Sequence, residues 1–253
     1  MNWKALGKSI LVLAFWLGVW ALLALIVGRE LLLPGPWTVA KRLGALALTA
    51  DFWSTVAVSL GRILCGAALG VLAGVVLAAG TSRFRVLDAL LTPLLTVIRA
   101  TPVASFILLV LIWVGRDILP VVIVFLMVLP VVWANVAAGI AAADRELLEM
   151  AAVYRFSPWE KVRRIYAPSA APYFLSALQT GLGLAWKSGV AAEVLTVPAR
   201  SIGRQLYESK LYLQTVELFA WTAAVVVCSL VIEKLLSAGV ARLRRHRRMG
   251  GSA

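Results

Sequence analysis

The stretch ILVLAFWLGVWALLALIV, residues 10–27, is an uncharged apolar run near the start of the chain. It is long enough to cross the hydrocarbon core of a bilayer, which is about 30 Å thick. Lys4 and Lys8 precede it, and Gly28-Arg29-Glu30 follows it and leads into more apolar sequence instead of a cleavage site. Basic residues favour the cytoplasmic side, so the run predicts an uncleaved membrane helix over about 9–28 with a cytoplasmic N-terminus.

The composition of the whole chain agrees with a membrane protein. Of the 253 residues, 62% are hydrophobic and 15% are charged, whereas a soluble domain carries about 25% charged residues. So few charges cannot cover a soluble globule, but lipid requires no polar cover. The composition therefore excludes a soluble globule, a disordered chain and a secreted disulfide scaffold. Cys65 and Cys228 lie in apolar runs, which is typical of inert thiols.

Further apolar runs predict an all-α integral membrane protein with about six transmembrane helices in one domain, 1–253. After the first helix, the predicted spans cover about 56–80, 87–115, 118–141, 170–195 and 214–237. The third span has to tolerate Arg99 and Pro102. Leu33-Pro34-Gly35-Pro36 ends the first helix, and residues 38–53 form an amphipathic stretch that we expect at the outer interface.

The distribution of basic residues predicts that both termini are cytoplasmic. Fifteen lysines and arginines fall in the segments assigned to the cytoplasm and seven in the outer segments. This bias matches an even number of spans. The net charge of +13, much of it in a basic tail over 240–253, then reflects topology and attraction to anionic lipid. Because the tail has no interleaved aromatic residues, we expect no nucleic-acid binding.

The second predicted span carries small residues at every fourth position, Gly66, Gly70 and Gly74. Such a row allows another helix to approach closely, so its predicted role is helix packing. The spacing leaves open whether the partner helix belongs to this chain or to a second copy.

The most charged segment between two predicted spans is the loop Asp144 to Pro168. Leu147, Ala151 and Tyr154 recur at helical spacing, and Asp144 is placed to cap a short helix that ends near Phe156. By periodicity alone, this loop could equally be an amphipathic segment lying on the membrane.

A second short helix is predicted directly after the first. Ser157-Pro158-Trp159-Glu160 has the pattern of a capping box with proline at the first helical position. In that arrangement the serine oxygen accepts from the Glu160 amide, and the Glu160 carboxylate accepts from the serine amide. The helix is expected to run from there to Ile165.

The same loop resembles the EAA motif of bacterial ABC importer permeases, which reads Glu-Ala-Ala, three residues, Gly, nine residues, Ile-x-Leu-Pro. The matching residues are Glu149-Met150-Ala151, Arg155 and Ile165-Tyr166-Ala167-Pro168. Around this loop, Ser59-Leu60-Gly61-Arg62 and Ala185-Trp186 to Glu193 are similar to the nitrate, taurine and aliphatic-sulfonate branch of those permeases. Arg155 stands where the family has glycine, so either it accepts a left-handed conformation or the turn is built differently.

The resemblance implies a permease subunit in the bacterial inner membrane that performs no catalysis itself. Its partners would be two ATP-binding cassette ATPases, which bind ATP and Mg²⁺, a second permease copy, most simply an identical one, and an extracytoplasmic substrate-binding protein. The loop residues expected to couple to the ATPases are Glu149, Met150, Ala151, Tyr154, Arg155, Ser157 and Glu160. Relatives carry small sulfonates, nitrate, bicarbonate or thiamine-related pyrimidines, so the sequence does not name the solute.

The residues themselves argue against enzymatic chemistry. Gly181 to Lys187-Ser188 nearly matches a phosphate-binding loop, but Trp186 occupies the place of the second glycine, and the surroundings are a hydrophobic helix. His246 is the only histidine and lies in the basic tail, so we expect no catalytic residues, no metal site and no cofactor bound by this chain.

Ionisable and polar residues inside the predicted spans are candidates for a transport route. Arg99, Asn135 and Lys187 lie deepest, and we assign them to the translocation path or to structural roles. Arg62, Glu217, Glu233 and Lys234 lie near span ends and are best explained as paired or snorkelling charges. Two deep basic groups favour an anionic or zwitterionic solute. The alternative function is an ion-coupled secondary transporter, although an internal repeat is not visible.

Overall fold

The computed structural model describes residues 3–249, which form helices joined by short connections. In chain order these are α1 (Trp3–Val27), α2 (Pro36–Ala47), α3 (Ala50–Arg83), α4 (Arg85–Ala100), α5 (Val103–Val110), α6 (Leu119–Ala141), α7 (Arg145–Val153), α8 (Pro158–Lys161), the π-helix η1 (Val162–Tyr166), α9 (Ala167–Thr196), α10 (Ile202–Leu211) and α11 (Thr215–Met249). The predicted basic tail, 240–253, lies outside the described residues from position 250 onward.

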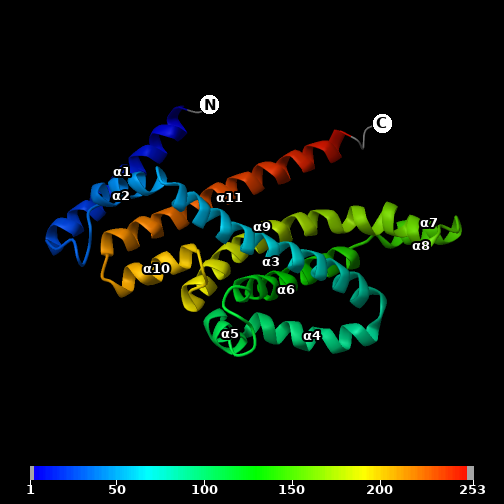
Figure 1. The fold of residues 1–253 in the computed structure, drawn as a ribbon. Coiled ribbons are helices and arrows are strands. Elements are labelled where there is room, and N and C mark those ends of the chain that lie inside the picture. Colours follow the sequence, from blue (N-terminus) through cyan, green and yellow to red (C-terminus); the bar gives the residue numbers. More distant parts are fainter. Residues whose placement is uncertain (1–2, 250–253) are drawn as a thin grey trace.

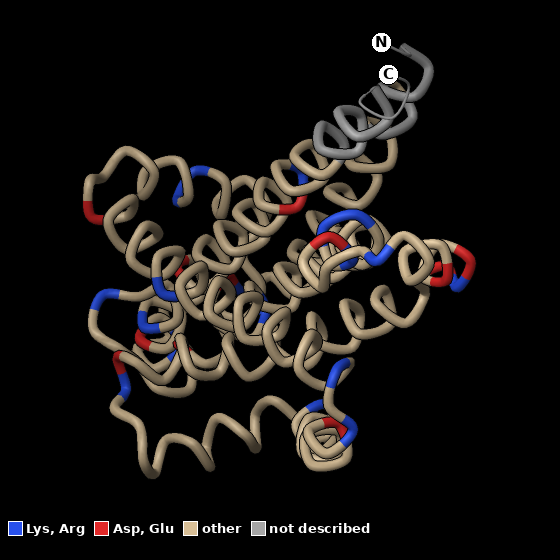
Figure 2. Tube along the Cα trace, turned by 90° about the vertical axis from the view of Figure 1, so that its right-hand side faces the viewer, with Lys and Arg blue, Asp and Glu red and all other residues tan. Residues whose placement is uncertain are grey.

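The predicted all-α membrane fold is confirmed. By length and composition, α1, α3, α6 and α11 can each cross a membrane, and the bent pair α4–α5 makes a fifth span if it is counted as one. Figure 2 shows long stretches of helix without a charged residue. The predicted span 170–195 corresponds to α9, which is 30 residues long but contains Lys187 and Glu193. The count of six spans therefore stays a prediction.

The predicted third span, 87–115, is not a single straight helix. The chain forms α4 and α5 instead, and their axes differ by 108°. Pro102 explains the break, because proline disfavours the α conformation in the residue before it. That residue, Thr101, is extended, with a ψ of 130°. Arg99 consequently lies in the last turn of α4.

The glycine row of α3 packs within this chain, which answers the question that the spacing left open. A Cβ on Gly66 would lie 2.5 Å from the carbonyl oxygen of Val121 and 2.9 Å from the Cβ of Val124 in α6. Gly70 and Gly74 face α6 in the same way, one and two turns further along. A larger residue at any of the three would force α3 and α6 apart, so their predicted packing role follows directly from this close approach.

The centre of the molecule is the group formed by α3, α6 and α9, which contact one another (Figure 1). A Cβ on Gly139 of α6 would lie 2.7 Å from the Cα of Ala170 in α9, so the backbones of these two helices also approach closely. Beside this group, the indole nitrogen of Trp186 in α9 donates to the carbonyl of Val225 in α11 at 3.2 Å.

The N-terminal helices lie at the edge of this group. The first helix ends at Val27, before the proline-rich turn, as predicted, and its apolar side chains are largely exposed. The amphipathic helix α2 is shorter than the predicted stretch 38–53. Thr49 begins a new helix at that point, because its hydroxyl accepts from the Phe52 amide at 3.3 Å.

Candidate functional site

The loop between α6 and α9 is folded as two short helices at one end of the bundle (Figure 1). Asp144 begins the first of them, as predicted, because its carboxylate accepts from the Glu146 amide at 2.9 Å. The helix α7 ends at Val153, a few residues earlier than the sequence indicated. We call residues 144–166 the coupling segment.

Arg155 does adopt the left-handed conformation, with a φ of 52°. The Phe156 amide donates to the Ala151 carbonyl at 2.8 Å, and the Arg155 amide donates to the Ala152 carbonyl at 3.1 Å. These two bonds form a Schellman motif, the turn that glycine usually makes at a helix end. The replaced glycine therefore leaves the turn intact, at a conformational cost of roughly 1 kcal/mol.

The predicted capping box at the start of α8 is present. The Ser157 amide donates to the Glu160 carboxylate at 2.9 Å, and the Glu160 amide donates to the Ser157 hydroxyl at 3.3 Å. Hydrogen bonds from the Ser157 backbone and hydroxyl hold the pKa of the exposed Glu160 carboxyl below its ordinary value. Both ends of the turn between α7 and α8 are thus fixed by local contacts.

The predicted coupling residues differ in exposure, which separates contact residues from packing residues. Ala151 is fully buried, so it packs inside the segment. Met150 and Tyr154 are exposed, Tyr154 to 72%. Sequence reasoning left Val153 and Trp159 out of this set, yet they are 79% and 70% exposed. Nothing in the sequence indicated this, because single apolar residues are common on protein surfaces.

The second helix of the coupling segment does not end at Ile165, as expected, but continues into α9. The helices α8, η1 and α9 follow one another without a break from Pro158 to Thr196. In η1 the Ala167 amide donates to the Val162 carbonyl, one residue further back than in an α-helix. Pro168 accounts for this wide turn, because its ring cannot accommodate an α-helical carbonyl four residues earlier.

The structure does not bring the three candidate path residues together. Arg99 has an exposed side chain at the end of α4. Asn135 lies in α6, where its side-chain amide donates to the Val131 carbonyl of the preceding turn at 2.8 Å. Lys187 lies in α9, nine residues before the helix ends at Thr196. Their assignment to a common path stays a prediction.

Lys187 lines a groove of about 590 Å³ between α9 and α11. The polar residues of this groove are Gln179, Thr180, Lys187, Ser229, Glu233 and Ser237. Such a polar strip is unusual on membrane helices, where polar groups face a cavity or other protein rather than lipid. Of the three candidates, Lys187 is the one that lines this groove.

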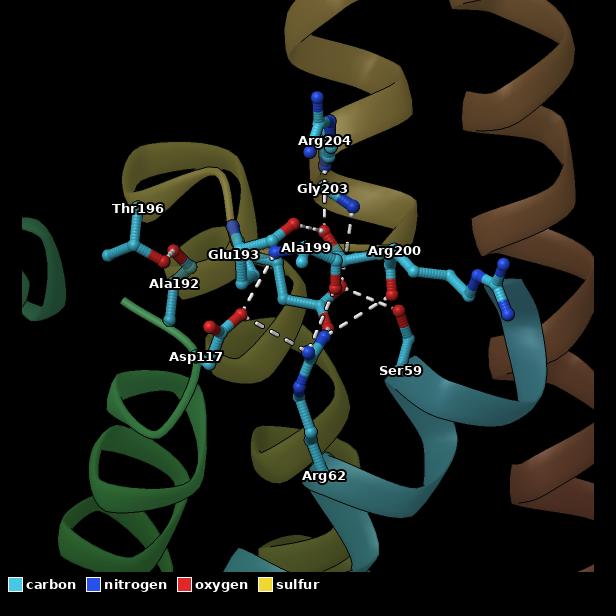
Figure 3. Close-up of polar contacts among 12 residues, drawn as sticks. Ser59, Arg62, Asp117, Ala192, Glu193, Thr196, Ala199, Arg200, Gly203 and Arg204 are labelled. Carbon is cyan, nitrogen blue, oxygen red and sulfur yellow. Dashed lines mark hydrogen bonds and ion pairs between the residues drawn. The ribbon is translucent and has the colours of Figure 1, made fainter. Parts of the chain in front are cut away.

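A second group of polar residues lies at the end of the bundle opposite the coupling segment. It comprises Ser59 and Arg62 of α3, Asp117 before α6, Glu193 of α9 and Gly203 of α10, and we call it the distal cluster (Figure 3). Glu193 is fully buried. Its carboxylate accepts from the Ser59 hydroxyl at 2.8 Å and from the Gly203 amide at 3.3 Å, and it lies 3.7 Å from the Arg62 guanidinium.

Several contacts compensate the cost of burying this carboxylate. An isolated buried charge costs several kcal/mol, so it needs a counter-charge and hydrogen bonds. Arg62 supplies the charge, Ser59 and the Gly203 amide supply hydrogen bonds to one of the two carboxylate oxygens, and the N-terminus of α10 adds a favourable dipole. A Cβ on Gly203 would overlap the backbone of Glu193 and Val194, so only glycine permits this contact.

The connection between α9 and α10 is held by the same cluster. Arg62 donates to the Ala199 carbonyl at 2.9 Å and to the Arg200 carbonyl at 3.3 Å, while the Ala199 amide donates to Asp117 at 2.9 Å. Val197 and Arg200 have φ values of 48° and 47°. Left-handed backbone at a non-glycine residue costs roughly 1–2 kcal/mol, so these contacts hold a strained connection in place.

Sequence reasoning explained Arg62 and Glu217 as paired charges, and both are paired. Arg62 contacts Glu193 and Asp117, and Glu217 of α11 forms an ion pair with Arg42 of α2. The sequence did not predict that the residues of the distal cluster lie together, because Ser59 and Glu193 are 134 positions apart. Their spacing carries no signal that they meet.

Comparison with known sequences points to transport proteins. A family model described as "Binding-protein-dependent transport system inner membrane component" matches residues 70–249. A probable ABC transporter permease protein of Brucella melitensis is 27% identical over 96% of this chain and 99% of its own length. The putative aliphatic sulfonates transport permease protein SsuC of Bacillus subtilis is 27% identical over 94% of this chain and 85% of its own length. The taurine transport system permease protein TauC of Escherichia coli is 24% identical over 94% and 88%.

Comparison with solved structures points to the same fold. The crystal structure of an amino acid ABC transporter superimposes with a TM-score of 0.66. The match covers 79% of this chain and 97% of that chain, at 22% sequence identity. At this identity the likeness concerns the fold alone.

Proposed function

Because this chain belongs to the family of binding-protein-dependent transport system inner membrane components, we propose that it couples the ATPase cycle of two separate subunits to alternating access for a small solute. It is a permease component, related to permeases of the sulfonate and taurine branch, and not itself an ATPase. In the proposed assembly two copies form the pathway, the ATPases bind ATP and Mg²⁺, and an extracytoplasmic protein delivers the solute.

The exposed apolar side chains of the coupling segment carry this proposal. Val153, Tyr154 and Trp159 project from short helices whose ends are fixed by hydrogen bonds. Rigid, exposed aromatic residues are typical anchors of protein–protein interfaces. Because the segment extends beyond the bundle (Figure 1), a partner can reach it without entering the membrane. This end would face the cytoplasm, and both termini with it.

Movement at the coupling segment would reach the membrane directly. The unbroken helical run from Pro158 to Thr196 passes from this segment through the centre of the bundle. Because the helical run continues through the wide turn of η1 without an intervening loop, a displacement at α8 would be passed on to the start of α9. Alternating access is then a change in how α9 and its neighbours are arranged in the two copies.

The groove beside α9 supports a zwitterionic solute. Lys187 offers a positive charge there and Glu233 a carboxylate, with hydroxyl and amide groups from Thr180, Ser229 and Gln179 around them. A solute that carries both signs of charge could exchange its hydration for these groups. The relative named for taurine agrees with this chemistry.

The decisive test compares the same substitution at the two ends of the bundle. Tyr154→Asp places a charge in the proposed contact, whereas Tyr212→Asp alters a tyrosine of similar exposure, 67%, next to α10. Loss of an interface anchor costs about 2–4 kcal/mol, so Tyr154→Asp should abolish co-purification of the ATPase subunits and ATP-dependent uptake. Tyr212→Asp should retain ATPase binding. Normal assembly and uptake in Tyr154→Asp would contradict the proposed docking.

Uptake by reconstituted complexes tests the solute class. Lys187→Gln should reduce ATP-dependent uptake of a sulfonate while the ATPases remain bound, and Lys187→Arg should preserve it. Equal uptake by wild-type and Lys187→Gln complexes would remove Lys187 from the path.

A further inference from the structure

The distal cluster lies where the helical run from the coupling segment ends. Glu193 is one turn before the last residue of α9, Thr196. Beyond it the chain turns through residues 197–201 and enters α10. A movement of α9 therefore reaches this connection. Whether the connection moves with the helix depends on how firmly the two are joined.

Two sets of contacts hold the connection and the start of α10 to the helices. The Glu193 carboxylate of α9 accepts a hydrogen bond from the Gly203 amide. The Ser59 hydroxyl of α3 accepts one from the Ile202 amide at 2.9 Å. Both helices therefore hold the start of α10. Arg62 and Asp117 hold residues 199 and 200 from the other side. The four side chains come from three separate parts of the chain that meet only in the fold (Figure 3).

The backbone of the connection needs these contacts. Its two left-handed residues, Val197 and Arg200, lie on either side of Ala199, whose amide and carbonyl are both held by the cluster. Strained backbone persists where surrounding contacts fix it, and it relaxes once they are removed. Without Arg62, the connection would lose two contacts, those to the carbonyls of Ala199 and Arg200. Asp117 and Glu193 would also lose their counter-charge.

We infer that Arg62 and Glu193 are positioning residues of the transport cycle: Arg62 fixes the connection 197–201 to α3, and Glu193 fixes the start of α10 to α9, so that this segment follows the movement of both helices. This inference rests on the proposed function, because it assigns a use to motion that ATP supplies. It concerns the end of the permease opposite the ATPases. Without these contacts, ATP hydrolysis would continue, but less solute would be taken up for each ATP hydrolysed.

The test uses the complete reconstituted complex of permease, ATPases and binding protein, and measures solute taken up per ATP hydrolysed. Arg62→Gln and Glu193→Gln should lower this ratio about fivefold or more, the usual lower range of coupling between sites, while ATP hydrolysis persists. Asp117→Ala should act in the same direction and can be expected to fold, because the Asp117 side chain is 64% exposed. Arg62→Lys keeps the charge and should partly restore the ratio of Arg62→Gln.

Arg42→Gln is the matched control. It also removes an arginine from an ion pair between two helices, but that pair joins α2 to α11 and leaves α9 untouched. Its uptake per ATP should equal that of the wild type. A purely structural role for Arg62 would instead reduce uptake and ATP hydrolysis together.

Limited trypsin digestion of the same complexes supplies a readout that does not depend on transport. Cleavage after Arg200 should be faster in Arg62→Gln and Asp117→Ala than in wild type and Arg42→Gln, because the connection is released. Unchanged cleavage together with an unchanged uptake ratio in both variants would overturn the inference. If the wild-type complex itself shows no ATP-dependent uptake, the proposed function fails, and the digestion alone decides whether Arg62 holds the connection.

Discussion

The two ends of this permease are held together in opposite ways. In the coupling segment, contacts join neighbours in sequence: Asp144 bonds to Glu146, and Ser157 bonds to Glu160. In the distal cluster, several contacts join residues more than a hundred positions apart, such as Ser59 to Glu193 and Ser59 to Ile202. Local contacts stabilise each short helix by itself, whereas long-range contacts hold separate helices together.

This difference predicts how far the effect of a substitution spreads. Damage to the coupling segment should remain local, because its hydrogen bonds close within one or two turns. Damage to the distal cluster should spread, because the cluster joins α3, α9 and α10. The following experiments test that difference, starting with the largest expected effect.

Gly203→Ala should lower the stability of the permease more than the other substitutions below. The added Cβ would overlap the backbone of Glu193, which cannot move aside as a flexible side chain can. Overpacking of this kind costs about 1–3 kcal/mol, so the thermal unfolding midpoint of the whole permease in detergent should fall. Gly61→Ala is the control, because a Cβ there meets no atom within 4 Å. Equal midpoints for the two variants would show that the distal cluster does not unite the helices.

Ser157→Ala should cost less and act locally. It removes the hydroxyl that accepts from the Glu160 amide, and the loss of a helix cap costs about 0.5–2 kcal/mol. Hydrogen exchange followed by mass spectrometry should show faster exchange in residues 157–161, with the rest of the chain unchanged. Faster exchange that extends into α3 would break the proposed contrast between the two ends.

Arg155→Gly should stabilise the turn after α7, by at most about 1 kcal/mol. Glycine adopts the left-handed conformation that Arg155 now holds at a φ of 52°. The turn after α7 should therefore exchange its amides more slowly in the variant. Glu149→Gly is the comparison, because it places glycine in the middle of a helix, where it should destabilise α7. Faster exchange in Arg155→Gly would mean that the arginine side chain stabilises the turn.

The smallest effect is a dependence on pH confined to α8. Because the pKa of Glu160 is lowered in the folded segment, its capping contribution is complete above the ordinary carboxyl pKa, about 4.3. It is lost as the pH falls through the lowered value. Protection of residues 157–161, referenced to an unstructured peptide, should decrease in that acidic range. Glu160→Gln keeps an acceptor oxygen but does not titrate, so its protection should not change there.

Most of the helices and the coupling segment could be predicted from sequence, because both depend on short-range patterns. Uncharged runs marked the membrane helices, and the serine and glutamate of the capping box are three positions apart. The sharp bend at Pro102 was not predicted: there the chain turns by 108° between α4 and α5, within the expected third span. A hydropathy pattern averages over many residues, so it records the length of an apolar run but not a sharp bend within it.

The sequence by itself determined that this chain lies in a membrane, that Asp144 to Pro168 forms a folded loop, and that Gly66, Gly70 and Gly74 form a packing face. It did so because hydrophobic transfer, capping and small-residue spacing act between residues close in sequence. Only the tertiary structure decided that the glycine row meets α6 of the same chain, and that Arg62 and Glu193 meet at the end of α9. Such pairings depend on how whole helices pack, and each helix has several faces against which another helix could pack.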